Sequence, residues 1–196
     1  MKSFKTEKRT NKIVTVVKAR QQTLKVVLEN IHDPHNVSAI FRTCDAVGVE
    51  KVSLIYNNEP FPRIGKKSSA SAFKWVEKEK FTTVDECYSN LRKEGFKIFA
   101  SAIAPSAKNL YELDLTDKVA IVLGNEHRGV SEESASKADE LFLIPMMGMV
   151  QSLNVSVATA VILYEALRQR SEKNMYDESS LAEEILKIKI EEWLNK

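Results

Sequence analysis

Three short stretches of the sequence combine polar side chains with an apolar flank, and these are the places where chemistry could occur. They span residues 36–42, 123–129 and 144–158. A packed core does not need such polar groups, because burying each one without a hydrogen-bond partner costs about 1 to 3 kcal/mol. The three stretches are therefore candidates for binding or catalysis.

The first stretch carries an amide and a guanidinium in the pattern Asn36-x-x-Ala39-x-x-Arg42. An arginine can hold a phosphate through two parallel hydrogen bonds. The two polar residues lie about 240° apart around a helix, so they do not share one helix face. A structural interpretation stays open, in which Asn36 caps the helix and Arg42 is an ordinary surface residue.

The second stretch, 123–129, follows an apolar run and contains two glycines. The glycine spacing matches a Walker phosphate loop, but Val130 and Ser131 stand where that loop requires lysine and then serine or threonine. The turn at 29–36 likewise lacks the glycines of a dinucleotide-binding Rossmann site. Ligands collect at the carboxyl ends of parallel strands, so the stretch still favours function, with His127 interpreted as a solvated loop residue outside the mechanism.

The third stretch concentrates polar residues where a long helix is predicted to begin. Gln151, Ser152, Asn154 and Ser156 directly follow an apolar, methionine-rich segment. The methionines fit a core as flexible gap-filling side chains. The polar residues do not, so the sequence predicts a functional loop here.

The elements that must hold these stretches alternate between strand and helix patterns. Near-continuous apolar runs are typical of parallel strands buried on both faces, and they occur at 24–28, 52–56, 97–102, 119–123 and 141–144. Helical periodicity predicts helices at 37–47 and from Ser152 onward, and capping boxes predict helix starts at Thr83 and Ser180. The predicted fold class is α/β, with a mainly parallel sheet flanked by helices.

The composition fits one globular domain, because the chain has 196 residues of which 43% are hydrophobic and 29% charged. The apolar runs are too short to cross a bilayer and no secretory signal is recognisable, so we expect a cytoplasmic protein that does not bind membranes. Cys44 and Cys87 stand alone, which predicts neither a disulfide framework nor a metal site.

Positive charge is concentrated near the N-terminus. Residues 1–25 hold eight basic side chains and one acid, although the net charge of the chain is only +2. A local cationic surface attracts phosphates, so contact with a polyanion is one interpretation and a solvated chain end is the other. The expected organisation is a basic extension at 1–22, a core domain at 23–170 and a helical extension at 171–196.

In order and spacing, the three stretches resemble the three motifs of the SPOUT-class RNA ribose 2′-O-methyltransferases. They read Asn36-Val-Ser-Ala-Ile-Phe-Arg42, Leu123-Gly-Asn-Glu-His-Arg-Gly129, and Ile144-Pro-Met through Gln151-Ser-Leu-Asn-Val-Ser-Val-Ala158. The resemblance implies a SPOUT domain whose C-terminal segment forms a deep trefoil knot, although knots are rare in proteins. It also implies S-adenosyl-L-methionine as the cofactor, bound in that knot.

The resemblance further implies which residues form the site. Those expected to take part in catalysis are Arg42, Asn36, Glu126, Ser152 and Asn154. Those expected to bind the cofactor are Ser101, Gly124, Ile144, Met146 and Leu153. In the family, the arginine matching Arg42 activates the ribose hydroxyl. A guanidinium loses its proton only at strongly alkaline pH, so in an alternative Arg42 keeps its charge and holds a substrate phosphate that accepts the proton.

The two extensions favour transfer RNA as the substrate. They are most similar to those of the tRNA guanosine-18 2′-O-methyltransferases, which act on the D-loop, although this C-terminal extension is net acidic. The alternatives are a ribosomal RNA methyltransferase of the same family and a non-catalytic RNA-binding factor that has kept the fold. The residues expected to contact RNA are Lys8, Arg9, Arg20, Arg63, Lys66, Arg168 and Arg170. The resemblance also implies an obligate homodimer, in which Arg42 of one copy faces the cofactor of the other.

Overall fold

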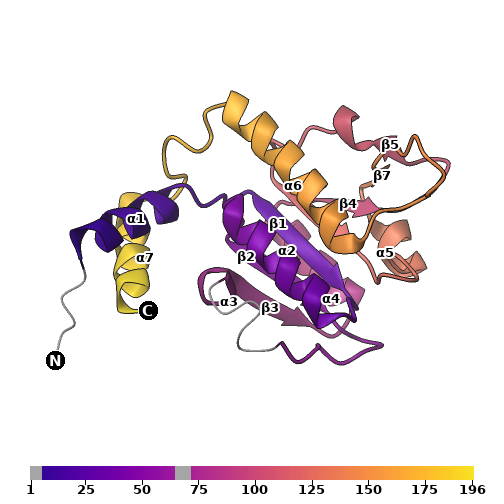
Figure 1. Cartoon of the computed structure of the whole chain (residues 1–196), viewed down its shortest axis with the longest axis horizontal. Coiled ribbons are helices and arrows are strands. Elements are labelled where there is room, and N and C mark those ends of the chain that lie inside the picture. The colour runs from indigo at the N-terminus through magenta and orange to yellow at the C-terminus, as the bar shows by residue number, and fades with distance from the viewer. Residues whose placement is uncertain (1–5, 65–71) are drawn as a thin grey trace.

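The computed structural model describes residues 6–64 and 72–196, and these form a parallel sheet between two layers of helices (Figure 1). The strand order is β3-β2-β1-β6-β4-β7-β5, and each strand runs parallel to its neighbours. The predicted α/β class is therefore confirmed. The strands are β1 (Leu24–Glu29), β2 (Lys51–Ile55), β3 (Glu77–Phe81), β4 (Lys97–Ser101), β5 (Lys108–Asn109), β6 (Val119–Leu123) and β7 (Glu140–Leu143).

Alternating side chains of the central strands build one core on each face of the sheet. Val26 and Leu28 of β1 pack towards α2 (Pro34–Ala46), α3 (Ala72–Trp75) and α6 (Val155–Glu172). Val27 packs on the opposite face, towards α4 (Val84–Lys93). Because helices cover both faces, the central strands are largely apolar, which is the pattern that predicted them, although β1 also buries Lys25 and Glu29.

Two further short helices complete the core region. Helix α5 (Glu132–Lys137) lies beside α4. The two are joined by a hydrogen bond of 3.1 Å that the Tyr88 hydroxyl of α4 donates to the carbonyl of Ser134. The 3-10 helix η1 (Leu110–Glu112) follows β5. No helix in the described ranges is long and apolar enough to cross a membrane.

The helix starts agree only in part with the capping predictions. Thr83 caps α4 as predicted, since its hydroxyl accepts from the Glu86 N–H at 3.1 Å. Asp33, not Asn36, caps α2, and Asn154, not Ser152, caps α6. The predicted start at Ser180 is also wrong, because α7 (Glu183–Asn195) begins after Ala182 without a side-chain cap.

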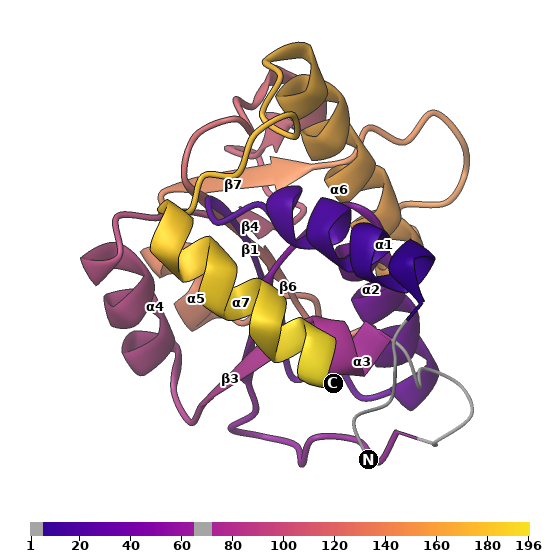
Figure 2. The ribbon, with the colours of Figure 1, turned by 90° about the vertical axis from the view of Figure 1, so that its left-hand side faces the viewer.

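The helices nearest the two ends of the chain pack on each other. Figures 1 and 2 both show α1 (Glu7–Lys18) beside α7, and in Figure 1 the pair lies to the left of the sheet. Ile13 and Val17 of α1 contact the apolar stripe of α7, which the helical period predicted and which consists of Leu186, Ile190, Trp193 and Leu194. The Trp193 ring lies 4.7 Å from that of Trp75, so the helix pair also contacts α3.

Two strands were not predicted from the sequence. Strand β3 reads Glu77-Lys-Glu-Lys-Phe81, a charged pattern that does not resemble a buried parallel strand. It lies at one edge of the sheet, where one side of the strand faces solvent. Strand β5 has only two residues, Lys108 and Asn109, and is too short to give a periodic signal.

Candidate active site

A pocket of about 610 Å³ lies at the carboxyl ends of β4, β6 and β7. Its wall is formed by residues of three segments, which follow β4, β6 and β7 in the chain. The carboxyl ends of parallel strands meet at one edge of a sheet, so segments far apart in sequence converge there. The wall contains all five residues expected to bind the cofactor: Ser101, Gly124, Ile144, Met146 and Leu153.

The turn after β6 is so tight that it requires glycine at Gly124. A Cβ atom at this position would lie 2.0 Å from the main-chain carbon of Gly129, so no side chain fits. The Gly129 N–H donates to the Asn125 carbonyl at 2.8 Å, which closes the turn. Main-chain groups of this turn therefore line the pocket directly.

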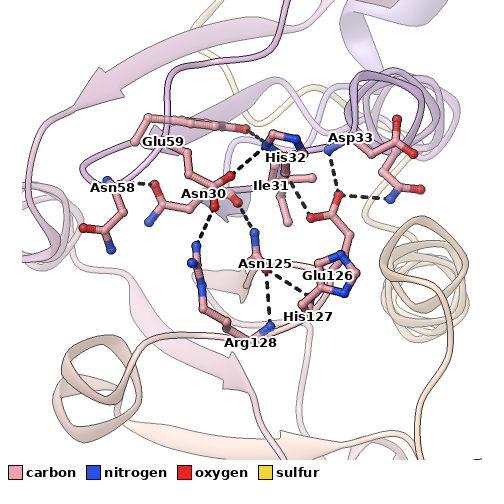
Figure 3. Close-up of polar contacts among 12 residues, drawn as sticks. Asn30, Ile31, His32, Asp33, Asn58, Glu59, Asn125, Glu126, His127 and Arg128 are labelled. Atoms are coloured by element: carbon pink, nitrogen blue, oxygen red, sulfur yellow. Dashed lines mark hydrogen bonds and ion pairs between the residues drawn. The ribbon is translucent and has the colours of Figure 1, made fainter.

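A pair of asparagines joins this turn to the loop after β1. The Asn125 side chain donates to the Asn30 carbonyl at 2.8 Å and accepts from the N–H groups of His127 and Arg128 (Figure 3). Asn30 has a φ of +51°, which is rare for residues other than glycine but tolerated by asparagine. Neither residue was among the predicted site residues, although Asn125 lies in the second motif, and an asparagine just after a buried strand is a usable signal for such a turn.

Glu126 connects the same two loops through its carboxylate. One oxygen accepts from the N–H of Asp33 and from the Asn36 side chain, both at 3.0 Å, and the other accepts from the N–H of His32 at 3.0 Å (Figure 3). The Asn36 side-chain oxygen in turn accepts from the Asn154 amide at 3.1 Å. Three of the five residues expected in catalysis, from three different segments, thus form one hydrogen-bonded chain.

Burial opposes ionisation of Glu126, but the hydrogen bonds from the Asn36 side chain and from the N–H groups of His32 and Asp33 outweigh it and lower the pKa of Glu126. A carboxylate that already accepts three hydrogen bonds is a poor proton acceptor at neutral pH. Its geometry suits it to fixing the loops instead.

The loop after β2 is fixed to the site by Glu59, which sequence analysis also missed. One oxygen of Glu59 lies 2.6 Å from the Arg128 guanidinium and the other lies 3.0 Å from Nδ1 of His32. No local pattern marks this glutamate, because both of its partners lie in other loops.

The two remaining residues expected in catalysis lie apart from this chain of hydrogen bonds. Ser152 is in the pocket wall, and its side chain is exposed. Arg42 is exposed on α2 and does not line the pocket. It forms no hydrogen bond or ion pair with any residue in the described part of the chain.

Two of the predicted RNA contacts are wrong. Arg170 is 0% exposed and Arg20 is 2% exposed, so neither can reach a phosphate. Arg170 donates to the carbonyls of Leu115, Thr23 and Asp117, and Arg20 pairs with Asp45. Burial lowers the pKa of Arg170 to about 10, which leaves it charged at neutral pH and dependent on those carbonyls.

The other predicted RNA contacts have different surroundings. Lys8 and Arg9 are exposed on α1, and Arg63 is exposed in the loop after β2. Arg168 is 54% exposed but paired with Glu165 and Glu172. Lys66 lies outside the described residues.

The sequence matches the model of the SpoU rRNA methylase family over residues 23–164. It is 43% identical over 192 residues to a tRNA (guanosine(18)-2′-O)-methyltransferase of Thermus thermophilus, covering 98% of each chain. It is 36% identical to a 23S rRNA (guanosine-2′-O-)-methyltransferase of Xanthomonas campestris, but covers only 65% of that protein. The fold is similar to the crystal structure of the TrmH/SpoU tRNA modifying enzyme of A. aeolicus, with a TM-score of 0.89, 41% identity and 96% of each chain covered. The matched region contains all three motifs and the pocket that the second and third of them line, and the chain belongs to the SpoU rRNA methylase family.

Proposed function

We propose that this protein is an S-adenosyl-L-methionine-dependent methyltransferase that methylates the ribose 2′-hydroxyl of guanosine 18 in tRNA. The observation that carries the proposal is the pocket lined by the second and third motifs, to which the first motif is joined by the hydrogen bonds of Asn36 with Glu126 and Asn154. Likeness over 98% of both chains to an enzyme named for that reaction supports transfer RNA. The chain covers only 65% of the similar ribosomal RNA enzyme, so methylation of ribosomal RNA is the second candidate function.

The pocket fits the proposed cofactor in shape and in chemistry. Ile144, Met146 and Leu153 give an apolar wall that suits the adenine ring, and the tight turn at Gly124 offers main-chain groups for polar atoms. When bound, the cofactor supplies a methyl group on a positively charged sulfur. An in-line displacement requires both reactants to be held in a fixed geometry, and the hydrogen bonds among Glu126, Asn36 and Asn154 supply that rigidity.

Arg42 is assigned to the substrate rather than to the cofactor. Its guanidinium stays protonated and can hold an RNA phosphate through two hydrogen bonds, which places that phosphate to accept the hydroxyl proton. Along α2, Arg42 lies about 9 Å further than Asn36 and about 240° around the helix. Within one chain, therefore, Arg42 does not face the pocket.

This geometry leads us to propose a homodimer with shared active sites. Apolar side chains lie exposed around the pocket rim and along α6, and Met147 and Met149 are 94% and 99% exposed. Val157 on α6 and Ile103 in the pocket wall extend this apolar surface. Covering it with a second copy would bring the partner's α2 to the pocket, with Arg42 acting in trans. We also infer the trefoil knot around the segment between β7 and α6, and a cytoplasmic location.

Subunit mixing tests the shared site. Arg42→Ala and Asn154→Ala are each expected to inactivate the homodimer. Heterodimers of the two variants would keep one intact site and regain about half of the wild-type rate per dimer. Two Arg42→Ala subunits mixed in the same way form the control. No recovery after verified subunit exchange would place Arg42 in its own chain's site.

Transfer of a labelled methyl group to RNA tests the activity itself. Unmodified tRNA should accept one methyl group, mapped to the ribose of guanosine 18, and a transcript with 2′-deoxyguanosine at that position should accept none. Methylation of ribosomal RNA alone would favour the second candidate. No transfer to either RNA despite cofactor binding would favour a non-catalytic RNA-binding factor.

A further inference from the structure

Strand β3 separates its charges between the two faces of the sheet. Side chains alternate along a strand, so the acids of Glu77-Lys-Glu-Lys-Phe81 point one way and the lysines the other. The acids are compensated: Glu79 lies 2.7 Å from the Lys51 ammonium, and Glu77 lies 3.3 Å from that of Lys189.

The two lysines of β3 face aromatic rings instead of carboxylates. The Lys78 ammonium lies 5.1 Å from the centre of the Phe73 ring and 6.0 Å from that of Phe41, and the Lys80 ammonium lies 5.7 Å from that of Phe61. Neither lysine forms an ion pair with a carboxylate of the described residues. Burial, and then the like charges of Lys196 and Lys80, lower the pKa of Lys78. The Lys78 ammonium donates a hydrogen bond to the Phe73 carbonyl at 3.0 Å, but no carboxylate of the described residues neutralises the charge of either lysine.

This pair lies on the face of the sheet that carries α2. Phe41 of α2 stacks on Phe73 of α3 at 4.1 Å, and Lys78 contacts both rings. Arg42 follows Phe41 directly in the chain. Helix α3 packs on α2 (Figure 1), and Lys78 contacts a ring of each helix, so this end of β3 lies next to the helix that carries Arg42.

We propose that Lys78 and Lys80 form an RNA phosphate-binding strip that extends the substrate surface of α2 across β3. The inference rests on the proposed function, because the polyanion that fits the strip is the RNA being methylated. Aromatic rings, and for Lys78 also the Phe73 carbonyl, hold the two ammonium groups in place without neutralising them, which leaves their charge available to phosphate.

The test compares RNA binding by wild type, by a Lys78→Ala/Lys80→Ala variant of the full chain and by a matched control. The control is Lys97→Ala/Lys118→Ala, which removes the same charge from exposed lysines. Lys118 also lies over an aromatic ring, 5.0 Å from the centre of Phe96, and Lys97 pairs with Asp117. Affinity for unmodified tRNA is measured by fluorescence anisotropy over a range of salt concentrations, and cofactor affinity by calorimetry.

Loss of two phosphate contacts should weaken RNA binding at least about ten-fold at 0.1 M salt and reduce the slope of log affinity against log salt by about 1.4 to 1.8. Cofactor affinity should not change, and the control should keep the wild-type slope. A Lys78→Gln/Lys80→Gln variant removes the same charges but keeps longer side chains, so it separates loss of charge from loss of packing. Thermal unfolding checks that this variant is folded. If both double variants keep the wild-type slope of log affinity against log salt, the proposal is overturned. The lysines would then serve only to protect the edge strand β3 from pairing with another strand. Absence of tRNA binding by wild type would overturn the proposed function as well.

Discussion

Replacing Glu126 with glutamine should destabilise the protein and weaken cofactor binding, although the two side chains have nearly the same shape. The carboxylate accepts from the N–H groups of His32 and Asp33 and from the Asn36 amide. Glutamine has one accepting oxygen, so in either orientation at least one of these donors would face an NH₂ group. A hydrogen bond to a charged acceptor contributes about 1.5 to 3 kcal/mol. The substitution should therefore lower the free energy of unfolding by an amount in that range.

Thermal unfolding measures this loss, as a fall in Tm of roughly 3 to 12 °C for a chain of this length. Glu126 has a lowered pKa in the folded state. Its stabilising effect is therefore complete above the pKa that it has in the unfolded chain, and it disappears as the pH falls through the pKa that it has in the folded protein. The variant should therefore differ from wild type near neutrality and converge with it in acid. Glu133→Gln, which removes a 45% exposed carboxylate paired with Lys137, is the control and should change Tm little. Equal Tm values for the two variants, with unchanged cofactor affinity, would refute the role given to Glu126.

Three other substitutions probe separate parts of the molecule. Arg170→Met should lower the free energy of unfolding in chemical denaturation by about 3 to 5 kcal/mol, because it leaves buried carbonyls without a donor, whereas Arg168→Ala should lower it by less than about 1 kcal/mol. Equal losses would contradict the structural role of the buried Arg170 side chain. Gly124→Ala should abolish cofactor binding in calorimetry, since the added methyl group would collide with the main chain of Gly129, and normal affinity would show that the turn can open. Lys8→Ala/Arg9→Ala should weaken tRNA binding and reduce its salt slope by about two, and an unchanged slope would make α1 a structural helix only.

The sequence by itself was sufficient for the features that depend on local patterns. The five predicted strands lie within about two residues of β1, β2, β4, β6 and β7, because burial on both faces makes such strands largely apolar. The cap at Thr83 and the apolar stripe of α7 depend only on residues a few positions apart. The resemblance of the motifs was also enough to predict the five cofactor-binding residues that line the pocket.

The tertiary structure decided everything that depends on which segment packs over a given side chain. Arg168 and Arg170 are alike in the sequence, yet the loop at 113–117 and Thr23, just before β1, bury only Arg170. The same holds for Asn30, Asn125 and Glu59, whose partners come from other loops. The exposure and charge balance of a polar side chain are set by contacts between distant segments, and no local period in the sequence records them. For this reason the acids and lysines of β3, which alternate in the sequence, became two chemically different surfaces only once the sheet had formed.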